Sequence, residues 1–335
     1  MTLSQTALLT KQIITFSILV IVLGIVSFIG YKIWHSYYLA HLPVIEEKPD
    51  TKFGILTVPN FPQTTASSSN FSYSIDTQTG NLPQLGIDPG FEKLQKVYFV
   101  NKTFATLLSS QESQNLAEKF NIASSPEILS DTNYRFSDTG KTLTVDLDNG
   151  NFIFERQATP SGNEALDNDT KLVSDFKNML KNLGVLKDDL NSGPSKVVKP
   201  QPNIAQISLW PTSINGKPIL TPQYDVSLIN AKIQKSADNI ENYLFLNFTY
   251  FPIELSTFAT YPIKTSEQAL EDLKSGKGII AVEPPQSNVS ITSVYLGYFL
   301  GQSYSPYLEP IFVFQGPHFV AYVSAIKEEF QTQTR

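Results

Sequence analysis

The chain has 335 residues, a formal net charge of −6, 41% hydrophobic residues and no cysteine. Its excess of acidic over basic side chains leaves no basic stripe for binding phosphates, which argues against nucleic acid as a partner. Without cysteine, and with only three histidines, the chain has no means of forming disulfides or thiolate metal sites and few means of binding zinc or copper.

The first element in chain order is an uncharged, proline-free segment at residues 13–31, between Lys11 and Lys32. A helix of this length reaches about 30 Å, the thickness of the hydrocarbon layer of a bilayer. Apolar residues surround the whole helix instead of forming one stripe. We therefore predict a transmembrane helix at residues 13–31, preceded by a short cytoplasmic N-terminus at residues 1–12.

A cleavable signal peptide is the competing interpretation, because secretory signals also begin with a basic start and an apolar run. The run is longer than a usual signal core, and no small-x-small cleavage site follows it, which favours an uncleaved anchor. The charges that flank the helix are nearly balanced, so the orientation rests on the shortness of the N-terminal side. We expect a single-pass protein of the cell membrane with a cytoplasmic N-terminus and the bulk of the chain outside the cytoplasm.

Two sets of side chains on this segment are candidates for contacts with another helix or with the bilayer interface. The first is a face of small residues at seven- and three-residue spacing: Ser17, Gly24 and Ser27. Small residues would let a second helix approach closely, although plain anchoring is the simpler interpretation. The second is a set of interfacial anchors: Tyr31, Lys32, Trp34, Tyr37 and Tyr38. A membrane-proximal stalk follows at residues 32–51, where His35 and His41 fit anchoring better than metal binding.

The rest of the chain is long enough for two domains, and we predict exported α+β domains at residues 52–158 and 165–328. The division is placed near residues 158–168, where the sequence TPSGN interrupts the pattern. Alternating apolar residues in the first domain predict an antiparallel meander with a two-residue turn at Asn149-Gly150. Its strands are expected at residues 133–137, 141–148 and 151–156.

Three short helices are expected, each with an apolar face and a recognisable end. They lie near residues 110–120 with a capping box from Ser109 and Glu112, at 169–183 with Gly184 as the closing residue, and at 266–274 capped by Thr265 and Gln268. Further strands are expected at residues 205–210, 223–230, 242–251, 288–300, 309–315 and 318–324. A helix followed by an antiparallel meander thus occurs three times, which suggests a repeated α+β unit.

The C-terminal part of the chain contains five characteristic runs, at residues 260–270 (TYPIKTSEQAL), 273–278 (LKSGKG), 294–298 (VYLGY), 308–314 (LEPIFVF) and 319–323 (FVAYV). These runs resemble the exported domains of the YycH/YycI type, which are similar in architecture to PepSY modules. It covers about the last seventy residues, and the remainder matches only in layout, with one N-terminal membrane helix and an exported α+β body. The resemblance implies an accessory, non-enzymatic role in which the protein tunes a partner such as a membrane sensor.

No residue set for catalysis, cofactor binding or metal binding is identified, and no cofactor is expected. The paired acids Asp146/Asp148 and Asp188/Asp189 fit a solvated strand face and a helix end, and His318 lies at a hairpin turn without a sequence-adjacent partner. We therefore predict a non-catalytic exported body that binds and modulates or scaffolds another envelope protein, or associates with itself. The alternative is a cell-wall ligand-binding or carboxylate-based hydrolytic module, since two carboxylates suffice for glycoside hydrolysis. A passive structural component of the envelope is a third possibility.

Overall fold

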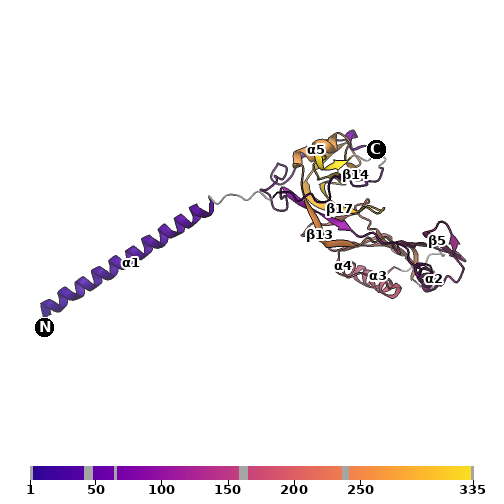
Figure 1. Cartoon of the computed structure of the whole chain (residues 1–335), viewed down its shortest axis with the longest axis horizontal. Helices are drawn as coiled ribbons and strands as arrows, with labels where there is room; N and C mark the ends of the chain where they lie inside the picture. Colours follow the sequence, from indigo (N-terminus) through magenta and orange to yellow (C-terminus); the bar gives the residue numbers. More distant parts are fainter. Residues whose placement is uncertain (1–2, 41–47, 64–65, 158–164, 236–240, 333–335) are drawn as a thin grey trace. The chain divides into compact units, whose positions relative to one another are not determined.

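The structure is a computed structural model that describes residues 3–40, 48–63, 66–157, 165–235 and 241–332. The chain divides into two compact units, residues 1–48 and residues 49–335. The second unit, called the body below, is an α+β structure rich in sheet (Figure 1). Residues 1–48 carry three lysines and two glutamates, so the remaining residues carry a net charge of −7.

The first unit contains one long helix, α1 (Leu3–Ala40), which extends beyond both ends of the predicted span at residues 13–31. Its segment Leu19–Tyr38 has a mean hydropathy of 1.6 and is not buried against any other part of the chain that the structure describes. This segment is long and apolar enough to cross a membrane, a property that membrane anchors share with signal sequences. Within the predicted stalk, residues 32–40 are helical, whereas residues 41–47, including His41, lie outside the described residues.

The larger sheet of the body carries short helices on one face, α2 (Ser109–Lys119), α3 (Asp169–Leu183) and α4 (Asp188–Ser192) (Figure 1). Leu172, Phe176 and Leu180 of α3 are fully buried in the core cluster that includes the inner face of this sheet. In spatial order the strands are β4 (Glu127–Ile128), β5 (Asn133–Asp138), β6 (Lys141–Asp146), β7 (Phe152–Arg156), β12 (Glu241–Phe248), β11 (Ile229–Lys235), β9 (Ile204–Leu209) and β8 (Ser195–Gln201).

The second sheet contains most of the C-terminal strands, and α5 (Ser266–Lys274) contacts its strand β18. Its main path runs β10 (Ile219–Leu220), β16 (Ser293–Phe299), β17 (Tyr307–Gly316), β18 (Phe319–Ser324) and β14 (Ile279–Val282). Strand β3 (Leu94–Val100) joins it by pairing with β17, and β13 (Ile253–Pro262) pairs with β3. A separate core cluster lies here, with Phe312, Phe314 and Tyr261 fully buried.

Two small parallel pairs tie distant parts of the body together. Strand β1 (Leu56–Thr57) pairs with β19 (Gln331–Thr332), so that the first and last strands of the body are neighbours. Strand β2 (Ser72–Ile75) pairs with β15 (Asn288–Ile291). Short 3-10 turns precede one strand of each pair, η1 (Ser68–Asn70) before β2 and η2 (Glu328–Phe330) before β19.

The structure groups the body differently from the two domains expected at residues 52–158 and 165–328. Strand β7 lies before the predicted division and pairs with β12, which lies after it, with Phe152 opposite Phe248. Strand β3 likewise pairs with β13 across the division. The first two predicted meanders therefore belong to one sheet, because β12 of the second meander pairs with β7 of the first. Residues 158–164 of the predicted boundary lie outside the described residues.

The helix predictions are confirmed most closely at α3 and α5. The Asn168 side chain accepts a hydrogen bond from the Lys171 amide, and Gly184 closes α3 in the left-handed conformation. Thr265 and Gln268 form the expected capping box on α5. The capping box expected on α2 is wrong: Ser109 is the first helical residue, and its hydroxyl accepts a hydrogen bond from the Thr106 amide instead.

Two strand predictions need correction. Strand β6 ends at Asp146 instead of residue 148, because the Asp146 amide pairs with the Asn151 carbonyl and residues 147–150 form a four-residue turn. Asp146 and Asp148 therefore do not share one strand face. The single strand expected at residues 288–300 is split into β15 and β16, and most of the strand expected at 223–230 precedes β11.

Candidate functional site

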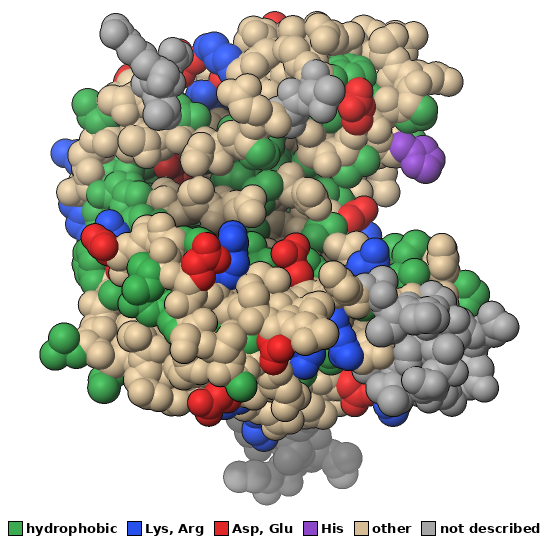
Figure 2. All heavy atoms as spheres, turned by 90° about the vertical axis from the view of Figure 1, so that its right-hand side faces the viewer, with side chains coloured by type: hydrophobic (Ala, Val, Ile, Leu, Met, Phe, Trp, Pro, Cys, Tyr) green, Lys and Arg blue, Asp and Glu red, His purple; other side chains and the backbone are tan. Residues whose placement is uncertain are grey.

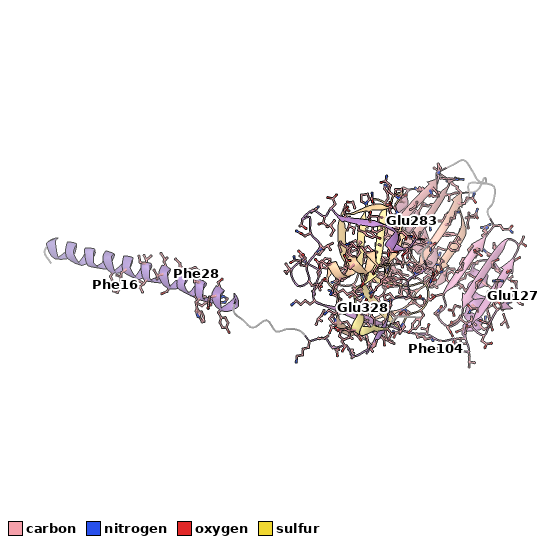
Figure 3. The ribbon with its side chains drawn as sticks, turned by 90° about the horizontal axis from the view of Figure 1, so that it is seen from above. Phe16, Phe28, Phe104, Glu127, Glu283 and Glu328 are labelled. Carbon is pink, nitrogen blue, oxygen red and sulfur yellow. The ribbon has the colours of Figure 1, made fainter. Side chains whose placement is uncertain are left out.

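Helix α1 places the predicted association face on one side, as helical geometry requires. Ser17, Gly24 and Ser27 are all exposed, and a Cβ added to Gly24 would meet nothing within 4 Å. The side chains of Phe16 and Phe28 project outward from the same helix (Figure 3). Among the described residues, nothing covers this face, so its role in association stays a prediction.

The predicted interfacial anchors form an aromatic cluster at the C-terminal end of α1. The Tyr31 and Trp34 ring centroids lie 6.5 Å apart, and Trp34 stacks on Tyr38 at 5.8 Å. The Lys32 ammonium lies 5.9 Å from the centre of the Phe28 ring, and Tyr37 is exposed. Seven-residue steps relate Gly24 to Tyr31, Ser27 to Trp34 and Tyr31 to Tyr38, so the small-residue face continues directly into the aromatic cluster.

The first described residues of the body are fastened to strand β13, an arrangement called the tether joint below. The Thr51 amide donates to the Thr260 carbonyl at 3.2 Å, and the Asp50 amide donates to the Thr260 hydroxyl at 3.0 Å. The Tyr261 hydroxyl donates to the Gly54 carbonyl at 2.9 Å. The chain that follows α1 therefore enters the body at a defined strand of the second sheet.

A buried carboxyl group lies beside the tether joint. Glu309 is 2% exposed, and its Oε2 accepts a hydrogen bond of 2.8 Å from Gln331 Nε2, while Gln331 Oε1 accepts one of 2.9 Å from the Ser324 hydroxyl. Burial raises the pKa of Glu309 to about 8, and the hydrogen bond from Gln331 opposes that rise. Because Gln331 belongs to β19, this carboxyl group helps to hold the strand that pairs with β1.

A charged cleft, called the α5 cleft below, lies between α5 and the C-terminal segment. Its two adjoining parts have volumes of about 660 Å³ and 480 Å³ and share four lining residues: Lys264, Asp272, Lys277 and Glu328. Gln331 and Ser324 line the smaller part, which brings the cleft up to the partners of Glu309.

The shared residues form a chain of ion pairs. Lys264 Nζ lies 2.7 Å from Asp272 Oδ2, and both side chains are mostly buried, with exposures of 10% and 13%. Lys277 bridges Asp272 Oδ1, at 3.2 Å, and Glu328. Its hydrogen bonds to Glu328 and then to Asp272 raise the pKa of Lys277. A charged ligand could bind in this cleft by replacing one partner of these ion pairs. The spacing of residues did not indicate the cleft, because Lys264 and Glu328 are far apart in the sequence.

Three of the acids considered for hydrolysis accept hydrogen bonds from nearby amides and hydroxyls. Asp146 accepts from the Asp148 amide at 2.9 Å and from Asn149 Nδ2 at 2.7 Å, and Asp148 Oδ1 accepts from the Ala105 amide at 2.9 Å. Asp189 accepts from the Leu190 amide and from the Tyr250 hydroxyl. Among the described residues, no group of three or more His, Cys, Asp or Glu side chains is arranged to hold a metal ion.

On the face of the body drawn in Figure 2, acidic and basic side chains are interspersed and apolar side chains occur between them.

No family model matches this chain. No curated protein matches it either. Among solved structures, the chain is similar to an uncharacterized protein from Eubacterium rectale ATCC 33656, whose crystal structure was determined at 1.45 Å resolution. The two share 12% identity over 76% of this chain and 89% of that one, with a TM-score of 0.35.

Proposed function

We propose that this chain is a single-pass membrane protein with a cytoplasmic N-terminus, whose exported body binds and modulates or scaffolds another envelope protein. The role is that of a YycH/YycI-like accessory regulator, with a body related to PepSY-like α+β modules, and it requires no catalysis. The partner is a membrane sensor or another copy of the chain, contacted through the body and through α1.

The observation that carries this proposal is the complete exposure of the apolar helix. Along Leu19–Tyr38, large apolar side chains such as Val26 and Ile33 are more than 60% exposed. Leaving so much apolar surface in water costs about 25 cal/mol for each Å². The helix therefore needs lipid, another helix, or both, and its small-residue face with the aromatic cluster offers a second helix a defined side.

The tether joint supports regulation over passive anchoring. The end of the stalk donates hydrogen bonds to Thr260 of β13, and Gly54, three residues further on, accepts one from Tyr261. The neighbouring pair β1–β19 is held by the hydrogen bond from Gln331 to Glu309. A change in the C-terminal segment would therefore alter the part of the body that receives the stalk. A simple anchor needs no such attachment to a strand of the body.

Topology is tested with single cysteines, because the natural chain has none and each introduced thiol reports alone. A membrane-impermeant maleimide added to intact cells should label Ser303→Cys in the body, whose side chain is exposed. It should label Ser4→Cys only after the membrane is permeabilised. Labelling of Ser4→Cys in intact cells, or recovery of the full-length chain in the soluble fraction, would overturn the proposal.

Partner binding is tested by mild lysine-reactive crosslinking in membranes, followed by purification of the full-length chain. Recovery of one envelope protein in a reproducible ratio, or of a crosslinked dimer of the chain, is the expected result. Recovery of only the monomer with a bound sugar or peptide would support the cell-wall ligand-binding alternative instead.

A further inference from the structure

A second cleft, called the α2 cleft below, combines an apolar lining with an acidic rim. It has a volume of about 610 Å³, within the range of pockets that bury a ligand or an anchoring side chain. Its apolar lining comes from the loop before α2, α2 itself, β6 with the turn after it, and the end of α3 with the residues that follow: Phe104, Leu116, Val145, Leu147, Leu183 and Val185. Its acidic lining consists of Glu112, Asp146 and Asp148.

The loop before α2 presents large apolar side chains to solvent at the edge of this cleft. Phe104 is 65% exposed, Leu107 is 101% exposed and Leu108 is 65% exposed. Phe104 lines the cleft and lies at the surface of the body (Figure 3). Large apolar side chains that gather at the surface of one loop mark an interaction surface more often than a solvent-facing one.

The turn at residues 147–150 brings a second apolar segment to the same region. The Ala105 amide donates to Asp148 on one side of the turn, and the Leu147 amide donates to the Thr132 carbonyl on the other. Residues 128 and 129 precede that second contact, and Ile128 is 67% exposed. The turn that carries Asp148 thus makes backbone contacts with both the loop before α2 and the segment that follows β4.

The acidic charges of the α2 cleft are not neutralised within the described part of the chain. None of Glu112, Asp146 and Asp148 takes part in a described ion pair. Lys119, the basic residue of the lining, donates from Nζ to the Leu183 carbonyl at 2.9 Å, at the C-terminal end of α3. The cleft therefore presents a negative rim around an apolar floor.

We infer that the α2 cleft and the Phe104–Leu108 loop form the docking surface for a basic amphipathic segment of the partner protein. An apolar side chain of that segment would enter the cleft while lysine or arginine side chains pair with Glu112 and Asp148. Charge complementarity disfavours anionic lipid, which this rim would repel, and a second copy of the body, which has a net charge of −7. This inference rests on the proposed function and specifies the surface and chemistry through which it operates.

The experiment places the photoreactive residue p-benzoylphenylalanine at Leu107 of the full-length chain in its native membrane, with Ile87 as a control position. Ile87 is 75% exposed and does not line the cleft. Mass spectrometry of the adduct should identify a partner segment that contains basic and apolar residues, with a yield at least fivefold above that from Ile87. An adduct to an acidic or uncharged segment, to lipid or to a second copy overturns the inference, as does a yield equal to that from Ile87.

A matched pair of charge reversals tests the rim. Glu112→Lys and Glu118→Lys change the same charge on exposed positions of α2, but only Glu112 lines the cleft. The yield of photocrosslinking from Leu107 should fall at least fivefold with Glu112→Lys and less than twofold with Glu118→Lys. Circular dichroism should be unchanged in both variants. Equal losses of yield contradict the inference.

If Leu107 gives no adduct while lysine-reactive crosslinking still recovers a partner, the inference fails and the proposed function stands. If neither method recovers a partner, both fail.

Discussion

Gln331 donates a hydrogen bond of 2.8 Å from Nε2 to Oε2 of Glu309, which is 2% exposed, and so joins the last strand of the body to a carboxyl group in its core. The Glu309 carboxyl has no basic partner among the described residues and is kept neutral by burial. Ionisation of Glu309 would therefore place an unpaired charge in the core beside β19. Tyr261 of β13 lies in the same electrostatic environment, and burial raises its pKa to about 12, so it stays neutral over the range in which Glu309 titrates.

The first prediction concerns the pH dependence of stability. Burial raises the pKa of Glu309 from its ordinary value of 4.5 to about 8 in the folded body, so the folded state binds this proton more tightly than the unfolded state. The stabilisation is fully present below the unfolded pKa and is lost as pH rises through the folded value, with a slope of up to about 1.4 kcal/mol per pH unit. Urea unfolding of wild type and Glu309→Gln at intervals between pH 5 and 8 measures this effect. A wild-type slope no steeper than that of Glu309→Gln would contradict it.

The second prediction concerns the buried ion pair of the α5 cleft. Asp272→Asn leaves the charged Lys264 buried without its partner and should lower the free energy of unfolding by about 3–5 kcal/mol. The control is Asp175→Asn, which breaks an exposed pair with Lys171 of the same 2.7 Å length and should cost less than about 1 kcal/mol. Urea unfolding at pH 6 compares the two. Similar losses would mean that the Lys264–Asp272 pair contributes no more than a surface pair.

The third prediction concerns the small-residue face of α1. Gly24→Leu should block close approach of a second helix and weaken association by about 1 kcal/mol, roughly fivefold. Val26→Leu enlarges a side chain on the opposite side of the helix and should leave association unchanged. The fraction of crosslinked partner recovered from membranes measures both variants. Equal recovery from the two would assign α1 a purely anchoring role.

The fourth prediction concerns the close packing of β17 against β15. A Cβ added to Gly316 would lie 2.0 Å from the Ser290 carbonyl oxygen, so Gly316→Ala forces these strands apart. The expected loss is about 1–3 kcal/mol of unfolding free energy. Gly301→Ala meets no atom closer than 3.5 Å and should stay within about 0.5 kcal/mol of wild type. Thermal unfolding followed by circular dichroism separates the variants, and a neutral Gly316→Ala would show that the strands can move apart without cost.

Local signals in the sequence predict the elements whose ends are decided locally. Asn168 and Gly184 bound α3 as expected, and the capping box of Thr265 with Gln268 begins α5, because each uses residues within a few positions of one another. The capping box predicted for α2 is wrong because a nearby residue competes for its hydroxyl group. Thr106 competes for the Ser109 hydroxyl, and the Ser–Glu spacing alone does not reveal that competitor.

Contacts between distant residues could not be predicted in this way. The sequence pattern does not predict strand β13. Its pairing with β3 places Ala259 opposite Val97, and no local pattern indicates that contact. The charged residues of the α5 cleft and the Glu309–Gln331 contact also come from separate segments that only the sheet brings together. The division expected near residues 158–168 failed to separate the strands for this reason: a break in local pattern does not show which strand will complete the sheet.

The parallel pairing of β1 with β19 has a mechanical consequence for a body held by its N-terminal side. The two strands run in the same direction, and the Gln331 side chain fixes β19 to the core. A pull along the strand axis on the chain that precedes β1, once transmitted past the hydrogen bonds of Asp50 and Thr51 to Thr260, would load the hydrogen bonds of the pair together in shear instead of opening them one by one. Tension on the entry segment would thus be borne by several bonds at once before it reached the interior of the body.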